Sequence, residues 1–152
     1  MVGGVVAMCA LLAVVGPVQG PTVRVSVAGP AKAAPGTTIT LNVVLQIPEG
    51  YHVQAHTVPP PNIPTSVLLK LPRGFKAGKP VFPHPARGEA GGQTLDLFEG
   101  RVVVRVPVTI PRSARGPAAI TAEVTYQACD ATSCYPPAEA SVTHKITVAR
   151  TQ

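Results

Sequence analysis

The chain of 152 residues contains no tryptophan, three phenylalanines, three tyrosines and only 13% charged residues, whereas proline occurs 18 times. Each internal proline destabilises a helix by about 3 kcal/mol, so this composition excludes a mainly helical protein. A long apolar run is lacking except at the extreme N-terminus, which excludes a membrane-spanning enzyme. The net charge of +6 comes from scattered residues. Because no basic patch is formed, we expect no nucleic-acid partner.

Residues 1–20 have the pattern of a secretory signal. The apolar stretch Val5 to Val15 is too short to cross a bilayer, but its length is typical of the hydrophobic region of such a signal. Val18-Gln19-Gly20 provides an acceptable cleavage site. We therefore predict export to the periplasm and a single mature domain over residues 21–152.

The three cysteines have different expected fates. Cys9 lies inside the signal and is removed with it, and Met8 makes a lipid-anchor site at Cys9 unfavourable because a small residue is needed there. Cys129 and Cys134 remain as the only thiols of the mature chain. An even number of cysteines in an oxidising compartment indicates a disulfide.

Apolar and polar residues alternate along most of the mature chain, which is the pattern of half-buried strands. The predicted strands cover residues 22–27, 38–47, 51–56, 67–71, 101–110, 120–128 and 142–148, with weaker signals at 79–82 and 94–98. The proline-rich stretches Val58–Pro64 and Phe82–Gly92 are predicted loops. Pro107 has no N–H to donate, so its strand should lie at an edge or contain a bulge. Short strands without a credible helix predict an all-β, immunoglobulin-like sandwich of two antiparallel sheets.

The two remaining cysteines are separated by four residues, among which Asp130, Thr132 and Ser133 favour a turn. A hairpin with this loop places Cys129 directly opposite Cys134. Residues opposed in this way have Cα atoms about 4.5–5.5 Å apart, which is within disulfide range. The spacing therefore predicts a bond between the two sulfurs.

Whether that bond is a staple or a redox centre is left open by the residues alone. The closed loop has six residues, so the chain-entropy relation assigns the bond only about 2 kcal/mol. Cys129 shares the polar side of its strand with Gln127, which predicts a solvent-facing sulfur. Pro136-Pro137 ends the strand pairing beyond Cys134 and leaves the hairpin tip open to a partner.

The loop carries no Lys, Arg or His, and Asp130 lies next to Cys129. Both features disfavour a thiolate. A thiol pair of this kind exchanges slowly unless a docked partner activates it. The pattern therefore favours a disulfide that one dedicated partner reduces and another oxidises. Cys134, which is further from Asp130, is the expected attacking thiol.

The segment 124–137, V-T-Y-Q-A-C-D-A-T-S-C-Y-P-P, resembles the redox hairpin of the N-terminal periplasmic domain of the DsbD family of bacterial thiol:disulfide interchange proteins. The segments Glu49–Val53 and Leu97–Gly100 share the resemblance. It implies an immunoglobulin-like domain that receives reducing equivalents from a membrane-embedded relay through a thioredoxin-like domain. Such a domain passes them to periplasmic isomerases and to the thioredoxins of cytochrome c maturation.

For this chain the resemblance implies that Cys129 and Cys134 are the redox-active pair. The supporting residues are Tyr126, Gln127, Asp130, Tyr135 and Pro136. The loop that would cover the disulfide, His84–Glu89, has no aromatic residue here. The expected partners are thioredoxin-fold redox proteins and a separate membrane-embedded electron relay. The chain is then a free-standing domain or a piece of a longer protein.

Other chemistry has little support in the sequence. His52 and His56 lie four residues apart on one strand face, about 13 Å, which is too far to share a metal ion. His144 falls in an apolar row and is predicted to be a hydrogen-bonded core residue. We expect a monomer without metal or cofactor, and any enzymatic role would be that of a protein-disulfide reductase component. The alternative is a non-catalytic exported binding or structural module with a stapling disulfide.

Overall fold

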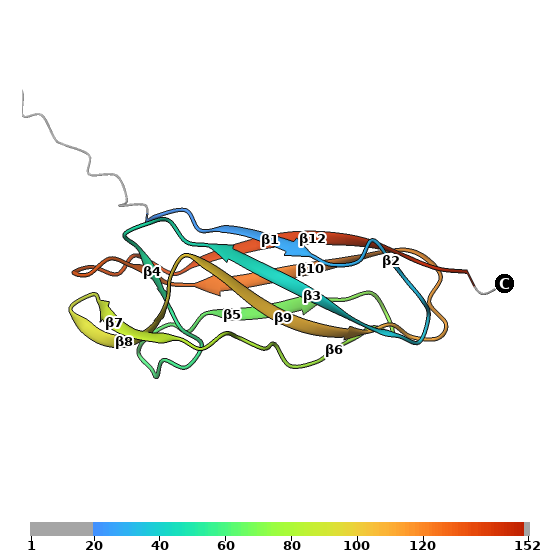
Figure 1. Ribbon diagram of the computed structural model, residues 1–152, viewed down its shortest axis with the longest axis horizontal. Helices are drawn as coiled ribbons and strands as arrows, with labels where there is room; N and C mark the ends of the chain where they lie inside the picture. Colours follow the sequence, from blue (N-terminus) through green and yellow to red (C-terminus); the bar gives the residue numbers. More distant parts are fainter. Residues whose placement is uncertain (1–19, 151–152) are drawn as a thin grey trace, which may run out of the picture.

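The computed structural model describes residues 20–150, and over this range it contains twelve strands and no helix (Figure 1). The strands are β1 (Arg24–Ala28), β2 (Lys32–Ala33), β3 (Thr38–Gln46), β4 (His52–Gln54), β5 (Ser66–Lys70), β6 (Lys76–Ala77), β7 (Ala86–Ala90), β8 (Gln93–Phe98), β9 (Arg101–Thr109), β10 (Gly116–Tyr126), β11 (Ala128–Cys129) and β12 (Ala138–Val148). Accordingly, this range has no helix capable of spanning a membrane. The predicted signal, apart from Gly20, lies outside the described residues.

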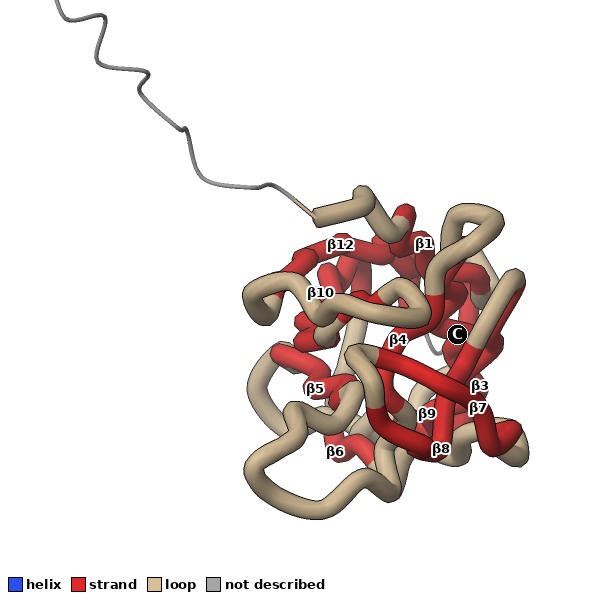
Figure 2. The backbone as a smooth tube through the Cα atoms, turned by 90° about the vertical axis from the view of Figure 1, so that its left-hand side faces the viewer, coloured by secondary structure: helices blue, strands red, loops and turns tan. Residues whose placement is uncertain are grey.

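Two sheets form a sandwich, with strand orders β1-β3-β9-β6 and β2-β12-β10-β5. The all-β, immunoglobulin-like prediction is confirmed. A third, smaller sheet of order β11-β4-β8-β7 is added to the two that were expected. It lies at one end of the elongated molecule, on the left in Figure 1, and that end faces the viewer in Figure 2. All strand pairs are antiparallel except β2 with β12.

The core lies between the two larger sheets and follows from the alternation of residues along their long strands. On β9 every second residue from Val102 to Val108 is buried, while Arg101, Arg105 and Thr109 are exposed. The facing row of β10 consists of Ile120, Ala122 and Val124, all at most 1% exposed. Because a strand turns successive side chains to opposite faces, this period of two generates the core directly.

A bulge lies beside Pro107, but in the neighbouring chain and not in β9 itself, which pairs with β3 without interruption. Ala77 pairs with Val108, but further along the same neighbour Val81 pairs with Arg105. Four residue steps on one chain therefore oppose three on β9, which means that an extra residue is inserted beside Pro107. Strand β9 is not an edge strand, since it lies between β3 and β6.

The prediction of a loop over 82–92 is wrong for Ala86–Ala90, which forms β7 and pairs with β8. Most of β7 is exposed, so it lacks the apolar alternation that marks other strands. The turn between the strands is Gly91-Gly92, with φ of 57° and 76°. Two consecutive positive φ values are what a two-residue hairpin turn requires, and glycine adopts them without strain.

We predict that Leu45→Ala lowers the free energy of unfolding by about 2–5 kcal/mol, because Leu45 is fully buried and its truncation leaves a cavity. Leu68→Ala is the control, since Leu68 is 63% exposed, and it should change stability by less than about 0.5 kcal/mol. Urea denaturation measures both. Equal effects of the two substitutions would contradict the position of the core.

Candidate functional site

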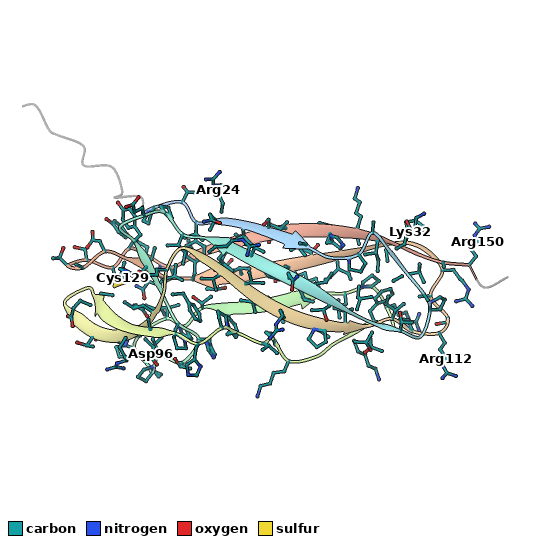
Figure 3. The ribbon with its side chains drawn as sticks, in the orientation of Figure 1. Arg24, Lys32, Asp96, Arg112, Cys129 and Arg150 are labelled. Atoms are coloured by element: carbon teal, nitrogen blue, oxygen red, sulfur yellow. A yellow bond between two sulfur atoms is a disulfide. The ribbon has the colours of Figure 1, made fainter. Side chains whose placement is uncertain are left out.

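Cys129 and Cys134 form a disulfide at the tip of a β-hairpin, with Cα atoms 4.0 Å apart. The site lies at the end of the molecule that carries the small sheet (Figure 3). Backbone hydrogen bonds flank the pair on both sides: Asp130 N–H donates to Ser133 O at 2.8 Å, and Tyr135 N–H donates to Ala128 O at 2.9 Å. The cysteines therefore occupy a non-hydrogen-bonded position of the ladder, where opposed residues approach most closely. The predicted pairing is confirmed.

The two sulfurs have different environments. Cys134 is exposed, whereas Cys129 is 0% exposed and belongs to a small apolar cluster. The other members of that cluster are Val58, Ala90, Leu95 and Leu97. The prediction of a solvent-facing Cys129 is thus wrong. After Tyr126 the chain leaves β12, and Cys129 pairs with β4 in the third sheet, where β7, β8 and the loop at Val58 cover it.

A buried glutamine reaches both sulfurs. The Gln54 side chain is on β4 and 2% exposed, and its Nε2 lies 3.6 Å from the Sγ of Cys129 and 3.7 Å from that of Cys134. Its Oε1 accepts a hydrogen bond from the Ile63 N–H at 2.9 Å, which sets the orientation of the amide. The sequence placed Gln54 on the polar side of its strand without marking it as a site residue. Its position between Val53 and Ala55 on a predicted strand could have suggested that Gln54 is buried. Nothing in the sequence indicated that this strand pairs with the cysteine hairpin.

Asp130 organises the loop between the cysteines. Its Oδ1 accepts hydrogen bonds from the Ser133 N–H at 2.7 Å and the Thr132 N–H at 2.9 Å, and the Tyr135 hydroxyl donates to Oδ2 at 3.2 Å. The backbone N–H of Ser133, followed by that of Thr132, lowers the pKa of Asp130. The same carboxylate raises the pKa of the Tyr135 hydroxyl. Asp130 therefore shapes the turn, in addition to the charge that it places beside Cys129.

Of the other predicted supporting residues, some contact the hairpin that carries the disulfide and others do not. The Gln127 Nε2 donates to Tyr135 O at 3.1 Å, which ties the strand before Cys129 to the strand after Cys134. The Tyr135 ring lies 6.1 Å from that of Tyr51, at an angle of 58°. Tyr126 is buried in the main core, away from the cystine, and Pro136 is exposed just before β12 begins.

The turn of the β7–β8 hairpin covers the disulfide. Gly91 N–H donates to Asp130 O at 3.1 Å, and Gly92 N–H donates to Ala131 O at 3.2 Å. A Cβ placed on Gly91 would lie 2.7 Å from the Sγ of Cys134. The covering segment is therefore Gly91-Gly92 and not the predicted 84–89, and glycine permits its backbone to lie directly against the sulfur.

The histidines take separate positions. His52 lies opposite Cys129 on β4, with its Nε2 3.1 Å from the Glu99 Oε2 and its Nδ1 buried without a hydrogen-bond partner. His56 stacks on Phe82 with ring centroids 4.3 Å apart, and burial lowers the pKa of His56. Within residues 20–150, no group of three or more His, Cys, Asp and Glu side chains is placed to hold a metal ion. The hydrogen bond predicted for His144 is present, to Pro30 O at 3.0 Å. The predicted core position is wrong, because β12 leaves this side chain only half-buried.

The fold and the hairpin cystine together define an immunoglobulin-like domain with one exposed and one buried cysteine. The chain belongs to the family described as thiol:disulfide interchange protein DsbD, N-terminal, whose sequence profile matches residues 21–146. The family and the disulfide support thiol–disulfide exchange, and membership implies interaction with thioredoxin-like redox proteins in general. Comparison with individually curated proteins gives no significant match.

Two solved structures show the same fold. The DsbD N-terminal domain of Neisseria meningitidis in the reduced form is 19% identical, with a TM-score of 0.51 over 81% of this chain and 85% of that one. The N-terminal periplasmic domain of ScsB from Proteus mirabilis is 11% identical, with a TM-score of 0.54 over 77% of this chain. This chain spans only 44% of the ScsB domain.

We predict that Asp130→Ala makes the free energy of unfolding fall less steeply as the pH becomes acidic, the part of the pH profile called here the acid limb. The pKa of Asp130 is lowered in the folded state, so its contribution is present above its ordinary pKa of 3.8 and is lost as the pH falls through the lower folded value. Urea denaturation between about pH 2 and pH 7 measures the profile. Glu139→Ala, which removes an exposed carboxylate of β12, should keep the wild-type acid limb. An unchanged limb in Asp130→Ala would contradict the role of the turn hydrogen bonds.

We also predict that Gly91→Ala destabilises the oxidised protein by at least about 1 kcal/mol more than Gly92→Ala. Both positions have positive φ, but a Cβ meets the Sγ of Cys134 only at Gly91, and it meets nothing within 4 Å at Gly92. Denaturation of oxidised and reduced samples measures the difference. It should shrink after reduction, when the Cys134 thiol is free to rotate away. A difference that survives reduction would place its origin elsewhere.

Proposed function

We propose that this protein is a periplasmic thiol–disulfide exchange module. It passes reducing equivalents between thioredoxin-fold partners through the Cys129–Cys134 dithiol and disulfide. The observation that carries the proposal is the unequal cystine at the hairpin tip, with Cys134 exposed and Cys129 buried, in a chain of the DsbD N-terminal family. The signal segment 1–20 and a mature domain 21–152 belong to this proposal.

The unequal exposure of the two cysteine residues supports the following order of events. A partner thiolate attacks the Sγ of Cys134, a new bond forms between those sulfurs, and the Cys129–Cys134 bond breaks. Cys129 leaves with the electron pair as a thiolate and takes up a proton. The partner's second thiol, as its thiolate, then attacks the partner sulfur in the mixed disulfide and releases Cys134, which is protonated in turn. The partner leaves oxidised, and this domain carries two electrons and two protons.

The supporting residues have structural parts in this scheme. Asp130 and Tyr135 hold the loop between the cysteines, and Gln127 joins the two sides of the hairpin. Tyr126 anchors the end of β10 in the core, and Pro136 lies where the pairing with β10 has not yet begun. The hairpin is thereby held on the sandwich, with the exposed Cys134 residue at its tip beside the covering turn at Gly91-Gly92.

We assign the electron donor to the thioredoxin-like domain of a membrane-embedded relay. The acceptors are periplasmic isomerases and the thioredoxins of cytochrome c maturation, so that the protein acts as a component of a protein-disulfide reductase. The resemblance of the segment 124–137 to the redox hairpin of the family supports this direction. One observation favours the alternative of a stapling disulfide: Cys129 is fully buried in an apolar cluster.

We predict that Cys129→Ser forms a stable mixed disulfide with a thioredoxin variant that lacks its second cysteine and carries a thionitrobenzoate disulfide on the first. The exposed Cys134 residue supplies the attacking thiolate, thionitrobenzoate leaves, and neither protein retains a thiol at the site that could resolve the adduct. Cys134→Ser, which keeps only the buried Cys129, should form at least tenfold less adduct. Non-reducing electrophoresis and mass spectrometry measure both. The wild-type midpoint should lie above about −300 mV, the range of labile disulfides. A lower midpoint together with no adduct would establish the staple instead.

A further inference from the structure

The Gln54 amide is placed to respond to the redox state of the cystine. Its Nε2 lies 3.6 Å from one sulfur and 3.7 Å from the other, and its oxygen is held by the Ile63 N–H. Its own backbone is fixed as well, since Gln54 N–H donates to Gln127 O and Thr65 N–H donates to Gln54 O. The donor therefore points at the sulfurs without freedom to turn away.

Cleavage of the disulfide creates an electrostatic problem at Cys129. Attack at the exposed Cys134 makes Cys129 the leaving group, and its thiolate forms in a pocket of apolar side chains. Burial without a partner disfavours such an anion strongly. Among the described residues, the Gln54 side chain alone donates hydrogen bonds to the cystine sulfurs.

We propose that Gln54 is a catalytic residue that stabilises the departing Cys129 thiolate. A cystine sulfur is a weak acceptor, whereas a thiolate is a charged and much stronger one, so the hydrogen bond strengthens as the S–S bond breaks. The interaction is thus greater in the transition state than in the oxidised ground state, which is the condition for accelerating a reaction. The proposal rests on the proposed exchange function and names a further residue for it.

Two ionisable side chains also lie near the sulfurs. His52 is opposite Cys129 on β4, with its Nε2 directed to Glu99, and Asp130 directs its carboxylate into the hairpin turn. Neither donates to a sulfur in the described structure. Both remain unchanged when Gln54 is substituted, so a change in thiol chemistry would report the amide itself.

The test replaces Gln54 by methionine, which keeps an unbranched side chain of similar length and removes the donor. With reduced glutathione as the attacking thiol, we expect Gln54→Met to lower the second-order rate of reduction of the cystine about tenfold. In a Cys134→Ser background, which removes the other thiol of the site, the absorbance of the Cys129 thiolate at 240 nm should titrate about one pH unit higher in Gln54→Met than with Gln54 present. Gln54→Glu, whose carboxylate repels the thiolate at neutral pH, should lose more than Gln54→Met.

Thr65→Val is the matched control. Thr65 is 1% exposed and donates to the backbone oxygen of Gln54, but its side chain makes no hydrogen bond to sulfur. It should lower stability while leaving the rate with glutathione and the thiolate titration within about twofold of wild type. If Thr65→Val slows reduction as much as Gln54→Met, the effect of Gln54 is structural and the proposal is overturned. Unchanged rate and titration in a folded Gln54→Met variant would overturn it too.

A measurement on the wild-type protein covers the case in which Gln54→Met does not fold. The side-chain amide resonances of Gln54 should shift on reduction and then titrate together with the Cys129 thiol. Gln54 amide resonances that shift neither on reduction nor with the titration of the Cys129 thiol would overturn the proposal. Failure of the proposed function gives a different result: normal reduction by glutathione and a normal Gln54 effect, with no exchange with any thioredoxin-fold protein.

Discussion

The strand that carries Cys129 changes sheets, and the arrangement of the site depends on that change. Strand β10 pairs with β12 as far as Tyr126, and two residues later β11 pairs with β4. If β10 had simply continued along β12, the polar side of the strand would have remained at the surface. The change of sheet places Cys129 beneath the β7–β8 hairpin and next to the Gln54 amide. Cys134, on the returning chain, stays outside.

The two cysteines of the disulfide thus have different surroundings. Cys129 lies among apolar side chains with one amide donor at hand, and Cys134 is at the surface beside the Gly91 backbone. A symmetric, fully exposed cystine could be attacked at either sulfur, and a fully buried one at neither. In the proposed exchange, this asymmetry directs attack to Cys134 and makes Cys129 the leaving group. A rigid sandwich end suits this task because the hairpin, the covering turn and β4 are joined by backbone hydrogen bonds.

The predictions from sequence were correct where a feature depends on alternating burial or on a local turn, and they failed where a strand is mostly exposed. Strands such as Arg101–Thr109 were recovered because their burial alternates strictly with position. Strand β7 was missed because it is largely exposed and its residues, such as Arg87 and Glu89, carry no apolar alternation. The pairing of Cys129 with Cys134 was predicted correctly because it depends on a four-residue turn, a local matter.

The amino-acid sequence alone determined the all-β class, the strands with a buried face and the cysteine pair, since each depends on near neighbours in the chain. Only the tertiary structure decided that Cys129 is buried, that Gln54 meets the sulfurs and that Gly91 covers them. These three features join segments tens of residues apart in the chain. A period of two says which side chains share a face, but what covers that face is set by the packing of distant strands.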